Sequence, residues 1–197
     1  MHLKNVAAAF FALTLGEVSH AYEGAPGAVH PEYSLPFSYG KCYHLKNHND
    51  EYIGHQGGPI GYLLFGHNAN TAIFKVCANT HICESNRQIE GVQAGEEWYL
   101  RDMEGSTLSK GPAYVVGGKP GFLYPAWGLN KNYLQFSALN ERSSYSDRSV
   151  RLHAHDSTFL MTTGLSIVPG VFGDHIMTAY SNEGILIDFE EVNCPPY

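Results

Sequence analysis

Residues 100–108 read LRDMEGSTL, and the same outline recurs at residues 45–53, LKNHNDEYI, and at residues 152–160, LHAHDSTFL. Shifting the sequence against itself by 55 and then by 52 residues superposes the three segments. Each begins with a leucine, which is followed by a potentially basic side chain, a polar residue and an aliphatic residue. These positions are Leu45, Leu100 and Leu152; Lys46, Arg101 and His153; Asn49, Glu104 and Asp156; and Ile53, Leu108 and Leu160. The outline predicts strand, polar turn and strand in three blocks.

Two further apolar runs follow in every block, and the last of them surrounds a phenylalanine. The third runs are 62–65, 122–124 and 176–180, and the fourth runs are 73–76, 133–136 and 187–189. Four strands in three blocks predict an all-β domain folded as a β-trefoil, in which six strands close a barrel and six cap it. The alternative is a β-sandwich or a jelly roll.

The composition fits one globular domain. The chain has 197 residues, with 12 Lys and Arg against 19 Asp and Glu, and its net charge of −7 disfavours nucleic acid as a partner. Hydrophobic residues make up 44% of the chain, which is enough for a core, whereas 21 Gly and 10 Pro disfavour long helices. The apolar run over residues 6–15 is about half as long as a membrane-spanning helix needs to be.

The N-terminus predicts secretion. Residues 1–21 combine an early positive charge, an apolar stretch and small side chains three and one residues before a cleavage point after Ala21, which is the pattern of a signal peptide. Residues 22–36 are rich in Gly, Ala and Pro and are expected to form an extended leader. The folded domain is then expected to span residues 37–197, in an extracellular and monomeric protein.

Four cysteines would lie in this oxidising compartment, where an even number favours two disulfides over a zinc site. Three connectivities are open to them. Cys77 and Cys83 enclose five residues and are suited to a local bridge, which leaves Cys42 and Cys194 to join the beginning of the domain to its end. That pairing is expected, because neighbouring termini are typical of the predicted fold.

The sequence contains no Gly-x-Ser-x-Gly or His-Glu-x-x-His motif, and its cysteines are better used in bridges, so we expect no enzymatic activity and no cofactor. His153 and His155 share one face of a predicted strand, and His175 could approach them. Because no further ligand pattern accompanies these histidines, no metal site is predicted.

Two loops are candidates for binding. The first contains Gly57, Gly58, Pro59, Ile60 and Gly61, whose glycines would let its backbone approach another surface closely. The second presents Arg87 just beyond the expected Cys77–Cys83 bridge. Both could also be ordinary turns of a Gly-rich β protein.

Part of the second block resembles the signature of Kunitz-type plant trypsin inhibitors, which are β-trefoils with two disulfides. The matching residues are Leu100, Asp102, Glu104, Gly105, Leu108, Tyr114 and Val116, whereas Ser106 departs from the charged or amide residue usual there. In that family the signature lies at the N-terminus, so no reactive-site residue is carried over to this chain. In size and in its strand-connecting loops the chain is also similar to the fungal cysteine-protease inhibitors called mycocypins.

The predicted function is therefore that of a secreted, non-enzymatic inhibitor of a host extracellular protease. The neutral Gly-rich loop favours a papain-like cysteine protease, whereas Arg87 would suit a trypsin-like enzyme. The signal, size and cysteine number resemble those of small fungal effectors acting in virulence. The alternative is a carbohydrate-binding trefoil that uses Tyr62, Trp127 and Tyr180 as aromatic platforms, although the Gln-x-Trp repeat of ricin-type lectins is absent.

Overall fold

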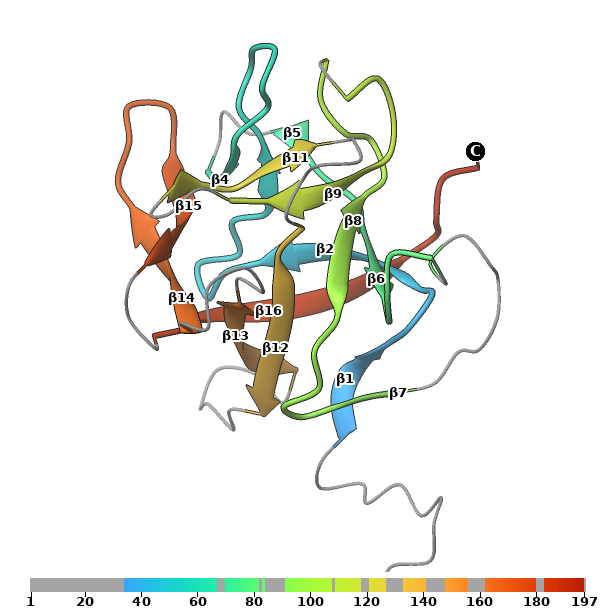
Figure 1. The fold of residues 1–197 in the computed structure, drawn as a ribbon. Coiled ribbons are helices and arrows are strands. Elements are labelled where there is room, and N and C mark those ends of the chain that lie inside the picture. The colour runs from blue at the N-terminus through green and yellow to red at the C-terminus, as the bar shows by residue number, and fades with distance from the viewer. Residues whose placement is uncertain are drawn as a thin grey trace, which may run out of the picture.

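The computed structural model describes residues 34–66, 70–81, 83, 91–107, 109–117, 121–126, 133–140, 148–155, 162–179 and 183–196. Over these residues the regular structure consists of β-strands, without an α-helix (Figure 1). None of the described residues forms a helix long and apolar enough to cross a membrane. The predicted signal peptide, residues 1–21, and residues 22–33 of the predicted leader lie outside the described residues.

The first and fourth strands of the three blocks form a closed barrel. Antiparallel pairing runs from β12 through β13, β16, β2 and β6 to β8. The ring closes where Trp98 and Phe136 exchange backbone hydrogen bonds of 2.8 and 2.7 Å. The strands are β2 (Cys42–Lys46), β6 (Phe74–Cys77), β8 (Tyr99–Asp102), β12 (Gln135–Asn140), β13 (Ser149–His155) and β16 (Ile185–Val192).

Three hairpins cap one end of this barrel. They are β3 (Ile53–His55) with β4 (Leu63–Phe65), β9 (Ala113–Val116) with β11 (Tyr124–Ala126), and β14 (Thr162–Val168) with β15 (Asp174–Ala179). The short strands β10 (Gly121–Phe122) and β5 (Asn70–Thr71) pair with β15 and β3. The hairpins meet where the amide of Leu63 donates to the carbonyl of Leu123 at 2.8 Å and the amide of Leu123 to that of Ile176 at 2.9 Å. A six-stranded barrel with three caps is the predicted β-trefoil.

The three-block pattern places equivalent residues in one core. The leucines that superpose the blocks are buried, and so is one phenylalanine from each fourth strand; they are Leu45, Leu100, Leu152, Phe74, Phe136 and Phe189. Each block therefore contributes a leucine and a phenylalanine to the same barrel interior, which would stay exposed in an isolated block.

The second strand of block two was misplaced by the sequence pattern. It begins at Ala113 rather than near Leu108, which itself lies outside the described residues, as does Leu160. The reason is a longer turn: Asp102 accepts two backbone hydrogen bonds, Gly105 has a φ of +68° and Lys110 a φ of +54°. These left-handed conformations delay the return of the chain to the extended form.

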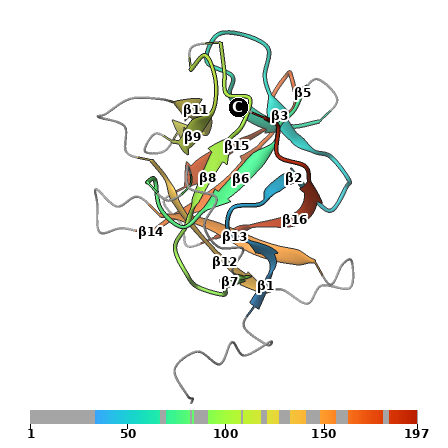
Figure 2. The ribbon, with the colours of Figure 1, turned by 90° about the vertical axis from the view of Figure 1, so that its right-hand side faces the viewer.

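A ribbon of β1 (Ser34–Ser38) and β7 (Gly91–Gln93) lies at the end of the barrel away from the caps (Figures 1 and 2). Phe37 is buried there, with its ring stacked on Phe189 at 4.0 Å between centroids. Strand β1 starts at Ser34, within residues 22–36, so the last part of the expected leader belongs to the folded domain. Leu35 and Phe37 point to the same side of this strand, and burying both holds it against the barrel.

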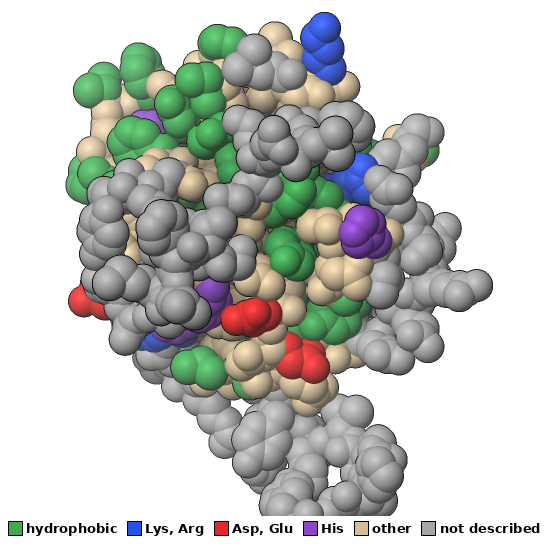
Figure 3. Space-filling model, viewed as in Figure 1, with side chains coloured by type: hydrophobic (Ala, Val, Ile, Leu, Met, Phe, Trp, Pro, Cys, Tyr) green, Lys and Arg blue, Asp and Glu red, His purple; other side chains and the backbone are tan. Residues whose placement is uncertain are grey.

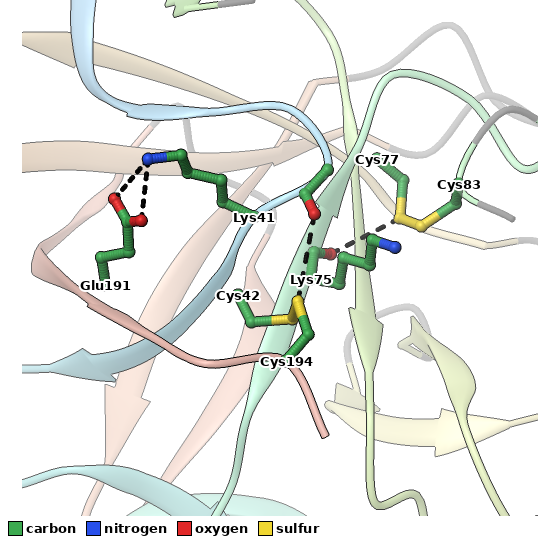
Figure 4. Close-up of a disulfide and its surroundings, with 8 residues drawn as sticks. Lys41, Cys42, Lys75, Cys77, Cys83, Glu191 and Cys194 are labelled. Carbon is green, nitrogen blue, oxygen red and sulfur yellow. Dashed lines mark hydrogen bonds and ion pairs between the residues drawn. A yellow bond between two sulfur atoms is a disulfide. The ribbon is translucent and has the colours of Figure 1, made fainter. Parts of the chain in front are cut away.

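Both expected disulfides are present (Figure 4). Cys42 on β2 is bonded to Cys194, just after β16, so one bridge joins the two ends of the described domain. Cys77 and Cys83 close the local loop after β6, and they pack with Tyr114 in a second apolar cluster outside the barrel.

Candidate functional site

The Gly-rich loop between β3 and β4 projects from the cap end of the molecule (Figure 1). Its base is closed by a hydrogen bond of 2.8 Å from the amide of Gln56 to the carbonyl of Tyr62. Gly57, Gly58 and Pro59 are exposed at its tip. Residues 56–62 line a hollow of about 130 Å³. The loop thus presents mainly backbone to an approaching surface.

The glycines of this loop have different structural roles. Gly61 has a φ of +67°, and a Cβ atom there would lie 2.9 Å from Cβ of Ser106, so only glycine allows the two loops to touch. Gly58 has a φ of +126°, which strains any residue with a side chain. Gly57 has neither restriction. Its φ lies outside the left-handed region, and a Cβ there would have no neighbour within 4 Å. Gly57 is therefore the position at which a side chain can be added without disturbing the loop.

A buried carboxylate braces the start of this loop. His55, the last residue of β3, hydrogen-bonds through Nε2 to Oδ2 of Asp102, whose exposed fraction is 0%. The other oxygen of Asp102 accepts hydrogen bonds from the amides of Glu104 at 3.0 Å and Gly105 at 2.8 Å. One carboxylate thus holds both the Gly-rich loop and the neighbouring turn of block two.

The charge state of His55 is set by this arrangement. Burial lowers the pKa of His55, but the hydrogen bond that its imidazole donates to Asp102 and the negative charges of Asp102 and Glu104 outweigh burial. The pKa of His55 is therefore raised above its ordinary value of 6.5. The pair gains strength when the imidazole is protonated, because a cation then faces a buried anion.

We expect the contribution of His55 to stability to decrease as pH rises. A histidine whose pKa is raised by folding stabilises the folded state fully below its unfolded pKa, and this stabilisation is lost as pH rises through the folded pKa. The unfolding free energies of the wild type and of His55→Gln, measured in urea, should therefore differ more at about pH 5.5 than at about pH 8.5. A difference that is constant, or larger at alkaline pH, would contradict this assignment.

The remaining predicted residues are divided between described and undescribed parts of the chain. Arg87, Trp127 and Tyr180 lie outside the described residues. Among the residues that the structure describes, no three His, Cys, Asp or Glu side chains gather as metal ligands. Within β13, His155 hydrogen-bonds through Nε2 to Oγ of Ser137 at 2.7 Å.

An aromatic cluster beside the Gly-rich loop was missed by the sequence analysis. Tyr62 packs edge-on against Phe122 and Tyr124, with centroids 5.5 and 5.9 Å apart, and His175 lies 4.7 Å from Phe122. These rings come from all three blocks, so no local spacing would have shown that they meet. Tyr62, which the carbohydrate-binding alternative uses as one of three aromatic platforms, belongs to this cluster.

Comparisons with known proteins support the fold. No family model matches the chain, and no curated protein matches its sequence. Several solved structures are similar to it. A Kunitz-type cysteine protease inhibitor from potato, PCPI-3, has a sequence identity of 11% and a TM-score of 0.58, and the match covers 84% of this chain and 99% of the potato protein. Winged bean albumin 1 is 13% identical with a TM-score of 0.57, covering 83% of this chain and 100% of its own.

The receptor binding domain of botulinum neurotoxin D is also similar, with 14% identity and a TM-score of 0.58 over 83% of this chain. The match spans 45% of that toxin fragment. At these identities the three likenesses support the β-trefoil fold alone, and the function has to be argued from the site.

Proposed function

We propose that the protein is a secreted, non-enzymatic inhibitor of a papain-like cysteine protease, which it blocks by inserting residues 57–61 into the catalytic groove. The observation that carries this proposal is the projecting loop with an exposed Gly-Gly-Pro tip and a base held by backbone and side-chain bonds. The potato neighbour is named as a Kunitz-type cysteine protease inhibitor, which shows that the shared fold is compatible with this role.

The chemistry of the loop suits such a groove. Glycines at 57 and 58 leave the backbone uncovered, so the chain can approach a catalytic Cys and His without a side chain in between. A loop already held in shape loses little conformational entropy on binding, which favours affinity. Residues 57–61 contain no Lys or Arg, so the loop offers nothing to the acidic specificity pocket of a trypsin-like enzyme.

The proposal is tested by steady-state inhibition with the purified mature protein, both disulfides formed, against papain and against trypsin. Papain is expected to be inhibited with a constant below micromolar, and trypsin is not. Arg87→Ala should leave papain inhibition unchanged, because Arg87 is the residue suited to trypsin-like targets. If the wild type inhibits trypsin and Arg87→Ala does not, the reactive site would be assigned to Arg87 and not to the Gly-rich loop.

Two outcomes would remove the inhibitor assignment. If neither enzyme is inhibited, the inhibitor assignment fails, and the protein would be assigned only as a binder of an unspecified host protein. Binding to chitin or to another polysaccharide on a glycan array, together with uninhibited papain, would establish the carbohydrate-binding alternative instead.

A further inference from the structure

Exposed apolar side chains gather around the third cap hairpin. Of the large hydrophobic residues that are exposed in the described part of the chain, four lie on this hairpin or on β10 beside it: Phe122 at 37%, Ile167 at 38%, Val171 at 92% and Phe172 at 54%. Leu139, on β12 of the barrel, is 51% exposed. Such a concentration around one hairpin is typical of an interaction surface.

The hairpin holds its apolar tip in a defined position. Gly173 lies so close to β4 that an added Cβ would be 2.3 Å from the carbonyl oxygen of Phe65. A Cβ on Gly170 would be 2.7 Å from the ring of His175. The turn is thus packed tightly at both of these glycines, whereas Val171 and Phe172 between them are exposed to solvent.

The aromatic cluster connects this tip to the Gly-rich loop. Tyr62 is the last residue lining the hollow of that loop, and its ring faces Phe122 and His175 at 5.5 and 6.3 Å. Hydrophobic side chains accordingly cover the upper left of the molecule in Figure 3, over the caps. A partner that engages residues 57–61 from this side would also meet the hairpin.

The charges favour a protein partner over other occupants. Residues 167–173 contain no charged side chain, and the chain as a whole carries −7, so an anionic lipid surface or a second copy would meet net repulsion.

We propose that Val171 and Phe172 form a second anchor, which docks on an uncharged, apolar rim beside the catalytic groove of the inhibited protease. This proposal rests on the proposed function and adds a contact outside the groove. Aromatic and aliphatic side chains on a rigid projection are efficient anchors, because little entropy is lost when they are buried.

The test measures the inhibition constant for papain and the rate at which the inhibitor dissociates from papain. The double variant Val171→Ser/Phe172→Ser is compared with Leu139→Ser as the matched control. The double variant is expected to inhibit about 10- to 100-fold more weakly, mainly through faster dissociation, whereas the control stays within about twofold. Both variants should melt like the wild type, because the substituted side chains are exposed.

Each other outcome overturns the anchor. If the double variant inhibits papain as strongly as the wild type does, the anchor is refuted and the proposed function is unaffected. Wild type that does not inhibit papain refutes both. Two further measurements test other occupants in a double variant that still inhibits papain fully. A dimer that sedimentation detects for the wild type and not for the double variant would assign the hairpin to a second copy. Flotation with neutral phosphatidylcholine vesicles that the double variant loses would assign it to a lipid surface.

Discussion

Gly57→Arg is expected to weaken inhibition of papain at least about 100-fold without lowering the stability of the inhibitor. Gly57 is exposed, and a side chain there has open space around it within the free protein. In the complex, the same side chain would lie between the loop backbone and the floor of the groove, where it would prevent close approach. The inhibition constant and the urea midpoint of the same preparation measure the two effects separately.

A matched control is available at Gly91. This glycine lies on β7, away from the caps, and an added Cβ has no neighbour within 4 Å there either. Gly91→Arg adds the same charge and should inhibit like the wild type. Gly58 is a poorer choice, because its φ of +126° would combine backbone strain with the clash. Equal inhibition by Gly57→Arg and Gly91→Arg would exclude the loop from the interface.

Removal of the Cys42–Cys194 bridge should give the largest loss of stability. Chain entropy predicts that a cross-link stabilises more when it closes a longer loop. The sequence separations are 152 residues for Cys42–Cys194 and 6 for Cys77–Cys83. The double variants Cys42→Ala/Cys194→Ala and Cys77→Ala/Cys83→Ala should therefore lose about 5 and about 2 kcal/mol of unfolding free energy, respectively.

The order of the two losses is the decisive part of this prediction. Cys77 and Cys83 are both buried, whereas in the other pair Cys42 is buried and Cys194 is exposed, so the loss of buried sulfur is greater for Cys77→Ala/Cys83→Ala and opposes the expected order. Urea unfolding of the two double variants at one pH compares them directly. A greater loss for Cys77→Ala/Cys83→Ala would show that local packing around Tyr114, rather than loop length, decides the contribution of a bridge.

The fold could be predicted because its determinants repeat along the chain. Leu45, Leu100 and Leu152 mark equivalent strands, and burial of all three in one barrel follows from the threefold arrangement. The pattern did not predict the start of β9 at Ala113, because the turn before Ala113 depends on the side chain of Asp102 and on positive φ angles. Hydrophobic spacing contains no information about such turns.

The candidate site could be predicted only in part. The glycines at 57, 58 and 61 were visible as a local signal, but the partners of His55 and Tyr62 come from distant blocks. The apolar tip at Val171 and Phe172 does have a local signal, since residues 168–173 read VPGVFG and place two hydrophobic residues in a Pro- and Gly-rich turn. A turn that exposes large apolar side chains is a candidate binding element on this ground alone.

The most direct test of the central claim is calorimetric titration of two forms of papain with the wild-type protein. One form has a free catalytic groove, and in the other a peptidyl chloromethyl ketone is attached to the catalytic cysteine and fills the groove. If residues 57–61 occupy that groove, the free enzyme should bind one inhibitor per molecule and the filled enzyme should show at least about 100-fold weaker binding. Equal affinity for both forms would contradict insertion of the loop into the groove.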